Sequence, residues 1–306
     1  QPTSSTLTPV YSTTEGLKQL SIRALSEQAI ELLQKYAVEE LLPQQWQPSQ
    51  LGLSDALLLL HRPPNDVDII ALEQGTHPAQ QRLVFEELLA QNLSLLKVRE
   101  QGQQVKAVAL EPTNSLEGQF LAQLPFAPTN AQSRVVSEIK ADLQNAYPMM
   151  RLVQGDVGSG KTLVAALSAL TAIARGYQVA LMAPTEILSE QHGINFSSWF
   201  ESLGITVAWL GGKTKGKERI NTLAMIASGE AQMIVGTHAL FQDEVKFNNL
   251  VLIIIDEQHR FGVHQRLSLR EKGRFGDCYP HQLVMTATPI PRTLAMTAYA
   301  DIETSV

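Results

Sequence analysis

The sequence predicts an α/β fold, in which a parallel β-sheet is covered by helices on both faces and preceded by a mainly helical segment. Short apolar runs alternate with helical patterns from about residue 116 onward. The runs are continuously apolar, which is typical of parallel strands covered on both faces. A glycine-rich stretch at 155–162 lies directly between one such run and a helical pattern, which is a common connection in α/β folds.

Six segments are predicted to be strands, and helical patterns fill most of the gaps between them. Each is rich in aliphatic residues and has the usual length of a strand. The predicted strands cover residues 149–154, 178–183, 206–210, 232–235, 250–255 and 282–285.

The chain before residue 116 has a different character. Residues 1–14 are rich in Ser, Thr and Pro and resemble a linker. Apolar residues then recur at helical spacing over 15–42, until Pro43 interrupts the pattern. The predicted apolar face of this helix consists of Leu17, Leu20, Ile22, Leu25, Ile30, Leu33 and Ala37.

Two further helices are predicted in this part of the chain. A short one covers 55–61, before the Pro63-Pro64 pair, and a longer one covers 76–101, with Pro78 in its first turn. We therefore predict a helical connector at 1–115 and a separate α/β lobe at 116–306.

The composition is that of an ordinary folded protein. Of 306 residues, 44% are hydrophobic and 18% are charged, and no apolar run approaches the roughly 20 residues that span a bilayer. The single cysteine, Cys278, cannot form an intrachain disulfide, so we expect a reducing cytoplasm. The chain begins with Gln rather than Met, which suggests a fragment. Its net charge of −6 means that any nucleic-acid contact depends on local basic clusters.

The glycine-rich stretch reads GDVGSGKT and fits the pattern of a phosphate-binding loop. Its glycines allow the backbone N–H groups to surround a phosphate, and the following helix directs its positive end to the same place. The expected phosphate-binding residues are Gly155, Asp156, Val157, Gly158, Ser159, Gly160, Lys161 and Thr162. Lys161 can reach the β- and γ-phosphates, and the hydroxyl of Thr162 can bind Mg²⁺. The alternative is a glycine-rich turn that happens to precede Lys-Thr.

A second candidate site follows the apolar strand at 250–255. Asp256 and Glu257 come directly after it, and ligands of open α/β sheets bind beyond the carboxyl ends of the strands. Asp256 can hold the Mg²⁺ that Thr162 also contacts, and Glu257 can act as the general base for an attacking water. The alternative is that both acidic residues cap the next helix.

These motifs, taken in order, resemble a known family. GDVGSGKT, APTEIL (183–188), GTHAL (236–240), DEQHRFGV (256–263) and TATPIPRT (286–293) resemble the first, RecA-like motor lobe of superfamily 2 helicases, and more narrowly their RecG branch. LPFAPTNAQ (124–132) and TPVYSTTEGL (8–17) also resemble that branch. The resemblance implies ATP and Mg²⁺ as cofactors.

The resemblance also implies roles for single residues. Gln132 would contact the adenine, although it also suits the first turn of a helix. Thr185, Glu186, Thr237 and His238 would lie on the DNA path, with helix capping or a structural histidine as the alternatives. Coupling of hydrolysis to lobe movement would involve His259, Thr286 and Thr288.

Two basic clusters fit a surface that follows a phosphate backbone, although charge runs are more often solvated faces. The first consists of Lys213, Lys215, Lys217 and Arg219. The second consists of Arg260, Arg266, Arg270, Lys272 and Arg274.

The resemblance implies a partner and a setting as well. The partner would be branched DNA, such as forks and Holliday junctions, with single-stranded DNA-binding protein as a further one. A monomer in the cytoplasm, associated with the nucleoid and not with a membrane, is expected. Superfamily 2 motors hydrolyse ATP between two lobes, and the second lobe and the wedge domain of the family are not found in these 306 residues. We therefore expect slow hydrolysis by the chain alone.

Three other functions compete with this one. The motor of a transcription-repair coupling factor shares the RFGV and TATPIPRT stretches, but DEQH in place of DEEH and the LPF lead-in favour the RecG branch. A P-loop small-molecule kinase would explain GDVGSGKT but not the later motifs. A module that binds ATP only as a structural ligand would have no need of Glu257 as a base.

Overall fold

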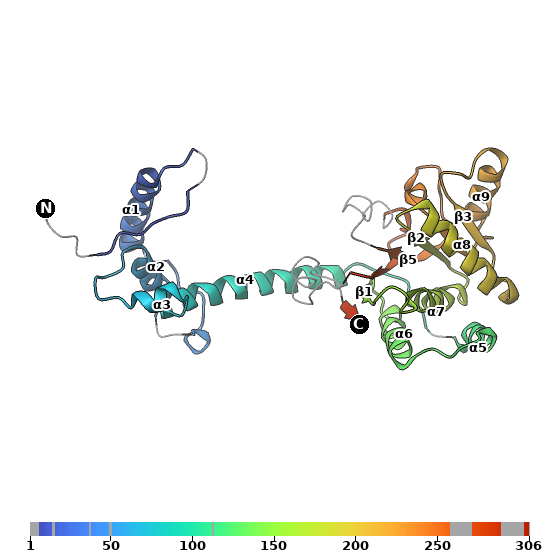
Figure 1. Cartoon of the computed structure of the whole chain (residues 1–306), viewed down its shortest axis with the longest axis horizontal. Helices are drawn as coiled ribbons and strands as arrows, with labels where there is room; N and C mark the ends of the chain where they lie inside the picture. Colours follow the sequence, from blue (N-terminus) through green and yellow to red (C-terminus); the bar gives the residue numbers. More distant parts are fainter. Residues whose placement is uncertain are drawn as a thin grey trace. The chain divides into compact units, whose positions relative to one another are not determined.

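The computed structural model describes residues 6–13, 16–36, 38–48, 51–111, 113–257, 271–288 and 303–305. The chain divides into two compact units, Gln1–Ser94 and Leu95–Val306 (Figure 1). This division lies before the boundary at 115/116 that the sequence suggested. The reason is that Leu110 is buried in the core of the second unit, where its N–H donates to the carbonyl of Leu143.

The first unit is helical, as predicted. Its elements are α1 (Gln19–Lys35), the 3-10 turn η1 (Gln44–Trp46), α2 (Leu53–His61), α3 (Ile69–Glu73) and the beginning of α4 (Pro78–Gln103). The predicted apolar face is only partly buried, however: Leu17, Leu20 and Leu25 are exposed, Ile22 and Leu33 are half-buried, and Ala37 lies outside the described residues. Leu20 and Leu25 are 78% and 62% exposed, and Ile30 is the buried residue of α1. Helical spacing thus located α1 correctly but not its burial.

A charged side chain occupies the interior of this unit. Arg82, on α4, is fully buried and forms ion pairs with Glu40 (Nη2 to Oε1, 2.6 Å) and with Glu86. A buried guanidinium requires such carboxylate partners, because its desolvation is otherwise uncompensated. The neighbouring Leu83 is half-buried.

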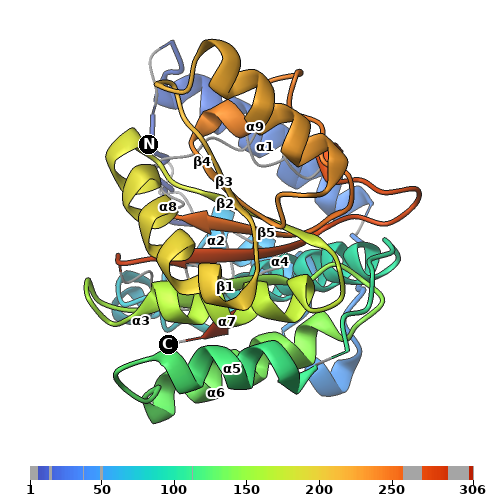
Figure 2. The ribbon, with the colours of Figure 1, turned by 90° about the vertical axis from the view of Figure 1, so that its right-hand side faces the viewer.

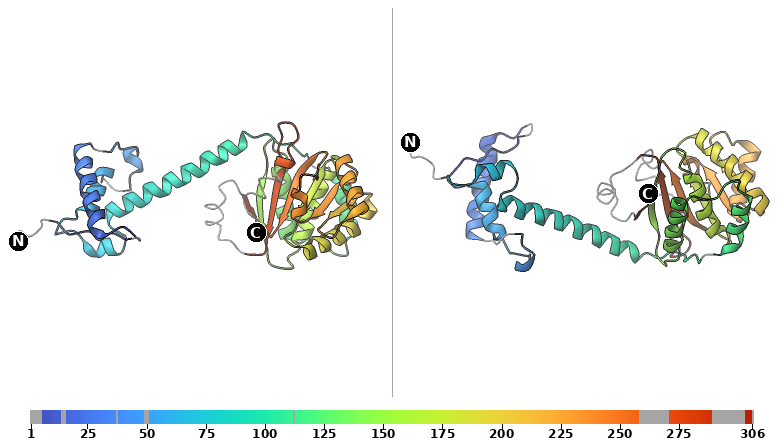
Figure 3. Two further views of the ribbon diagram at one scale, coloured as in Figure 1. Left: turned by 90° about the horizontal axis from the view of Figure 1, so that it is seen from above. Right: turned by 60° about the horizontal axis from the view of Figure 1, so that its bottom comes forward.

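The second unit contains a seven-stranded sheet in the described residues, with the order β3-β4-β2-β5-β6-β1-β7. Figure 3 shows this sheet with helices packed against it. All recorded strand pairs in it are parallel. The strands are β1 (Met150–Gln154), β2 (Gln178–Met182), β3 (Val207–Leu210), β4 (Met233–Gly236), β5 (Leu250–Asp256), β6 (His281–Thr286) and β7 (Glu303–Ser305). The six predicted strands and the α/β fold class are confirmed, and β7 is an addition.

Helices cover the sheet on both faces (Figure 2). The elements are α5 (Asn114–Gln123), α6 (Asn130–Leu143), α7 (Lys161–Ile173), α8 (Glu186–Phe200), η2 (Glu201–Leu203), α9 (Gly216–Ser228) and η3 (His238–Phe241). Core residues from α5, α6, α7 and α8 form one cluster. The other cluster contains Ile226 of α9 and Leu240 of η3. Figure 2 accordingly shows α5, α6 and α7 on one side of the strands and α9 on the other.

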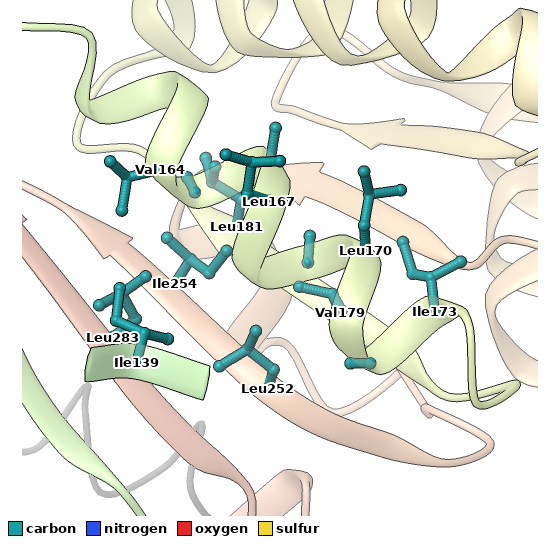
Figure 4. Packing of buried hydrophobic residues seen from close by; sticks show 14 of the residues in the cluster. Ile139, Val164, Leu167, Leu170, Ile173, Val179, Leu181, Leu252, Ile254 and Leu283 are labelled. Carbon is teal, nitrogen blue, oxygen red and sulfur yellow. The ribbon is translucent and has the colours of Figure 1, made fainter. Parts of the chain in front are cut away.

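Alternation along each strand explains the two layers. Val179, Leu181, Leu252 and Ile254 face the α7 side, where Leu167 and Leu170 pack on them (Figure 4). The intervening residues Ala180, Met182, Ile253 and Ile255 belong to the α9 side. Because both faces are covered, both sets are apolar, and this is why the strands read as continuous apolar runs.

The sheet order places the motifs at one edge. Parallel strands end at the same side of a sheet, and β6 lies between β1 and β5. The glycine-rich loop follows β1, and Asp256 ends β5 and is followed by Glu257. Thr286 ends β6 and begins the segment 286–288, which we call the threonine loop. The fold therefore gathers three separate motifs at one site. In the described residues, no helix combines the length and apolar character needed to cross a membrane.

A buried histidine joins the start of β6 to the rest of this unit. His281 is fully buried; its Nδ1 accepts from the Met149 N–H at 2.9 Å, and its Nε2 donates to the Val108 carbonyl at 2.8 Å. Burial lowers the pKa of His281, although the Val108 carbonyl and Asp142 act in the opposite direction. The folded chain therefore keeps this imidazole neutral, while the unfolded chain protonates it below about pH 6.5.

We expect His281 to make stability pH-dependent, because its folded pKa is the lower one. Its contribution is fully present above about pH 6.5 and is lost as the pH falls toward the folded pKa. His281→Asn should cost about 1–3 kcal/mol at neutral pH, because the Val108 carbonyl loses its donor. In urea unfolding, the stability advantage of the wild type over this variant should shrink as the pH falls from about 7 to about 5. An advantage that stays constant or grows would contradict the prediction.

Candidate nucleotide and metal site

The glycine-rich loop connects β1 to α7. Gly158 and Gly160 have φ values of +84° and +80°, in the left-handed region that favours glycine. Gly160 is the N-cap of α7, so the unpaired N–H groups of the first helical turn adjoin the loop. Val157 is 90% exposed, which places the loop at the surface. This geometry suits a phosphate group.

Lys161 lies along the same loop. Its Nζ donates to the carbonyl oxygens of Gly155 at 2.7 Å and Asp156 at 3.0 Å. A phosphate oxygen is a stronger acceptor for an ammonium group than a neutral carbonyl, so a bound anion can take over these donors. The charge of Lys161 is therefore already located at the predicted phosphate site.

Gln132 lies against the loop through its side chain. It completes a capping box at the start of α6, in which Thr129 Oγ1 accepts from the Gln132 N–H and Gln132 Oε1 accepts from the Thr129 N–H. Its Nε2 also donates to the carbonyl of Ser159 at 2.9 Å. A Cβ on Gly160 would come within 2.3 Å of that Nε2, so a side chain there would displace the Gln132 amide, while the φ of +80° is what favours glycine. Gln132 thus caps helix α6, as the alternative had it, and its side chain also lies against the phosphate loop.

Asp256 ends β5 and is held from a neighbouring helix. One of its oxygens, Oδ2, lies 2.8 Å from Nε2 of His192 on α8. Among the described residues its other oxygen, Oδ1, has no hydrogen-bond donor. That oxygen is the one available to a cation.

Glu257 has an unusual backbone. Its φ is +54°, and among the described residues no other non-glycine residue has a positive φ. Its N–H donates to the Met285 carbonyl at 2.9 Å, and its Oε1 accepts from the Ala287 N–H at 3.1 Å. Such strained backbone is retained where the surroundings fix it, commonly at functional sites. The alternative that Asp256 and Glu257 cap the next helix concerns residues 258–270, which lie outside the described residues.

The threonine loop, which begins at the last residue of β6, contacts the other two motifs. The Gly155 N–H donates to the Thr286 carbonyl at 3.2 Å, and the Ala287 N–H reaches Glu257. Within the loop, the hydroxyls of Thr286 and Thr288 are 2.8 Å apart. The structure thus connects both threonines to the phosphate loop and to the acidic pair. The third predicted coupling residue, His259, lies outside the described residues.

The residues at this edge fit Mg²⁺ bound together with a nucleotide. Mg²⁺ usually takes one or two protein oxygens and completes its shell with phosphates and water. The donors available are the Asp256 carboxylate and the half-buried Thr162 in the first turn of α7. In the part of the chain that the structure describes, no group of three or more His, Cys, Asp or Glu could hold a metal by itself. The site therefore suits a metal brought with phosphates, not an all-protein cage.

The predicted DNA residues lie at the ends of β2 and β4, on the same side of the sheet. Thr185 Oγ1 accepts from the Leu188 N–H at 3.3 Å and so caps α8. Glu186 Oε1 accepts from the Gly212 N–H at 2.8 Å and from the Thr237 hydroxyl at 3.1 Å. Thr237 is buried and His238 is exposed. Glu186 therefore fixes the loop after β3, where a Cβ on Gly211 would come within 2.4 Å of its Oε2.

The basic clusters are partly neutralised. Arg219 pairs with Glu244, and Lys213 lies 3.5 Å from Glu190. Lys272 donates to the Gln242 carbonyl, and burial lowers its pKa although Asp243 and Glu244 act to raise it.

The remaining members of the two basic clusters differ in their ion pairing and in their exposure to solvent. Arg274 is 4.0 Å from Asp277. Lys215 and Lys217 are exposed. The other three basic residues, Arg260, Arg266 and Arg270, lie outside the described residues. Lys215 and Lys217 are thus the described members best placed for solvent-borne phosphates.

The sequence did not point to His192 or to the glycine pair Gly211-Gly212. His192 belongs to no recognisable motif. A single histidine on a helix is more often structural, so its presence alone indicated no function. The positions of these residues follow from the sheet order. Because β2 lies beside β5, the helix after β2 reaches the end of β5.

Comparison with known proteins agrees with this geometry. The family model for DEAD/DEAH box helicases matches residues 129–297. The chain is 64% identical to the ATP-dependent DNA helicase RecG of Pasteurella multocida and 65% identical to that of Haemophilus influenzae. Each match covers 98% of this chain and 43% of the relative. The chain thus spans less than half the length of these curated relatives.

A solved structure agrees as well. RecG bound to a three-way DNA junction matches with a TM-score of 0.72 and 37% identity, over 98% of this chain and 39% of that one. The matches do not favour a transcription-repair coupling factor or a small-molecule kinase. The RecG resemblance predicted from the motifs is confirmed, and the chain belongs to the DEAD/DEAH box helicase family.

Proposed function

We propose that this chain is the ATP-binding and ATP-hydrolysing lobe of an ATP-dependent DNA motor that remodels branched DNA. The observation that carries the proposal is the hydrogen-bonded edge of the sheet, where Thr286, at the end of β6, accepts from Gly155 and the next residue, Ala287, donates to Glu257. The name of the RecG relatives, and the three-way junction bound in the solved RecG structure, support branched DNA as the substrate, which we propose includes forks and Holliday junctions.

The nucleotide would bind across the phosphate loop. Its β- and γ-phosphates would accept from the loop N–H groups and from Lys161, whose ammonium already lies there. The resemblance to RecG implies that Gln132 would contact the adenine, and its amide group lies beside Ser159 and Gly160 of the phosphate loop. Thr162 and Asp256 would hold Mg²⁺, which would supply positive charge to stabilise the phosphates during hydrolysis.

Glu257 would act as the general base. A carboxylate accepts the proton of the attacking water only when it is ionised and held in place. The hydrogen bonds of Glu257 to Met285 and Ala287 hold it in place from β6 and the loop that follows. Because Thr286 and Thr288 belong to the same loop, a change at the γ-phosphate would move them too. We propose that these threonines, together with His259, couple ATP hydrolysis to movement of the lobes.

DNA would bind near the ends of β2 and β4. Thr185 and His238 would face the DNA, together with the exposed Lys215 and Lys217. Glu186 and Thr237 would contribute by ordering the loop at Gly212, since a carboxylate repels a phosphate but accepts well from backbone N–H groups. This assigns a positioning role to Glu186 within the proposed DNA face.

The whole protein would act in the cytoplasm at the nucleoid, as a monomer, with single-stranded DNA-binding protein as a further partner. Its relatives are more than twice as long as this chain. In such motors an arginine from a second lobe completes the site and contributes about 10³–10⁵ to turnover. We therefore expect the 306-residue chain alone to bind nucleotide and to hydrolyse it slowly.

A chimera tests the proposal. The matching 301 residues of the Haemophilus influenzae relative are replaced by this chain, to which they are 65% identical. We expect the chimera to unwind forked DNA with ATP, and to do so much less without ATP or on linear duplex. The parent relative is the control. A folded chimera that binds forked DNA but turns over no ATP would overturn the proposal.

A further inference from the structure

We infer that His192 is a positioning residue for the metal-binding carboxylate, and that it joins helix α8 to the nucleotide site. The inference rests on the proposed function, since it assigns Asp256 to Mg²⁺. Its observation is separate from the motifs. The Nε2 atom of His192 lies 2.8 Å from Oδ2 of Asp256, across 64 residues of sequence.

The pair is well sheltered from solvent. The side chains of His192 and Asp256 are 9% and 13% exposed. The imidazole also packs beside Phe196 of the same helix, with ring centroids 6.5 Å apart. Water therefore competes little for this hydrogen bond, and the contact restricts the rotation of the carboxylate.

The hydrogen-bond partners indicate which nitrogen carries the proton. A carboxylate only accepts, so Nε2 must donate to Asp256. Nδ1 is buried and has no hydrogen-bond partner among the described residues. An unpaired N–H in that place would be costly, whereas a bare lone pair costs less. The neutral tautomer with hydrogen on Nε2 satisfies both atoms best.

This arrangement gives the two carboxylate oxygens of Asp256 different partners. Oδ2 is occupied by His192, and Oδ1 is left for the cation. Groups that orient a metal-binding side chain in this way commonly change metal affinity by about 10–100-fold when they are removed. His192 thus sets the orientation of Asp256 without touching the nucleotide.

The position of His192 on α8 has a further consequence. The same helix begins at the Thr185 cap and at Glu186, whose carboxylate holds Gly212 and Thr237. One rigid helix therefore bears both the proposed DNA face and the residue that orients Asp256. A shift of α8 on binding DNA would change the metal site through this one hydrogen bond.

Amide substitutions of different length test the inference. His192→Gln can place an N–H near the position of Nε2, whereas the shorter His192→Asn cannot. His192→Leu keeps an apolar neighbour for Phe196 and has no donor. The dissociation constant of the fluorescent, non-hydrolysable analogue mant-AMPPNP is measured for the 306-residue chain and each variant, in EDTA and in saturating MgCl₂. Thermal melting is recorded for each.

We expect Mg²⁺ to strengthen binding in the wild type and in His192→Gln. In His192→Asn and His192→Leu, the Mg²⁺ concentration for half-maximal strengthening should rise about 10-fold or more, with affinity in EDTA unchanged. The Leu variant serves if the Asn variant does not fold.

Unaltered Mg²⁺ dependence in a folded Asn or Leu variant would overturn the inference alone. The same holds for a loss of affinity in EDTA that equals the loss in MgCl₂. If the wild type binds no analogue under either condition, the proposed function itself fails and the inference falls with it. The affinity of the wild type in EDTA therefore separates the two failures.

Discussion

Replacing Glu257 by Gln will lower ATP turnover by about 10²- to 10⁴-fold, the usual contribution of a general base, and will leave nucleotide affinity nearly unchanged. The amide has the same shape as the carboxylate but cannot take a proton from water. Its oxygen can still accept from the Ala287 N–H, as Oε1 of Glu257 does. The loop after β6 should therefore keep its place, so that the loss reports on chemistry and not on folding.

Turnover is measured in the Haemophilus influenzae chimera with forked DNA, because the chain alone is expected to be slow. Glu201→Gln is the matched control: it removes an exposed carboxylate of the same lobe from η2, away from the site. It should leave turnover unchanged. If Glu257→Gln keeps its ATP turnover, or if turnover falls equally in Glu201→Gln, then Glu257 is not the general base.

The sheet could be predicted from sequence because burial on both faces leaves a plain signal. Val179 to Met182 and Leu252 to Ile255 are apolar at every position, since α7 packs on one face and α9 and η3 on the other. β7 gave no such signal: it is three residues long, reads Glu-Thr-Ser and pairs only with β1 on the edge of the described sheet.

Burial in the helical unit could not be predicted in the same way. The apolar pattern over 15–42 correctly indicates a helix, but Leu20 and Leu25 of the predicted apolar face are exposed. The interior instead holds Arg82, which is neutralised by Glu40 and Glu86. Periodicity reports the helix, whereas burial depends on partners that come from elsewhere in the chain.

Some residues of the candidate site could likewise be located from the sequence, and others could not. The phosphate loop, Asp256 and Glu257 could be located because each motif is local and follows a strand. The contact of His192 with Asp256 could not, because it depends on β2 lying beside β5. The same is true of Glu186 and Gly212, which the ends of β2 and β3 bring together.

Lys161→Ala is expected to weaken nucleotide binding by about 10- to 100-fold, the effect of losing a hydrogen bond from a charged donor. In the structure the ammonium already lies on the loop, 2.7 Å from the Gly155 carbonyl. Alanine keeps the helical start of α7, because it is a good helix former. The loss should therefore concern phosphate binding and not the fold. Lys246→Ala, which removes an exposed lysine elsewhere in the lobe, is the matched control.

The measurement that tests the central claim most directly is the dissociation constant of mant-AMPPNP for the 306-residue chain and for Lys161→Ala. Melting curves establish that both are folded. If 155–162 is the phosphate site of a motor lobe, the wild type and Lys246→Ala will bind saturably, and Lys161→Ala will bind about 10- to 100-fold more weakly. Equal affinity in the wild type and Lys161→Ala, or no saturable binding by the folded wild type, would contradict the account.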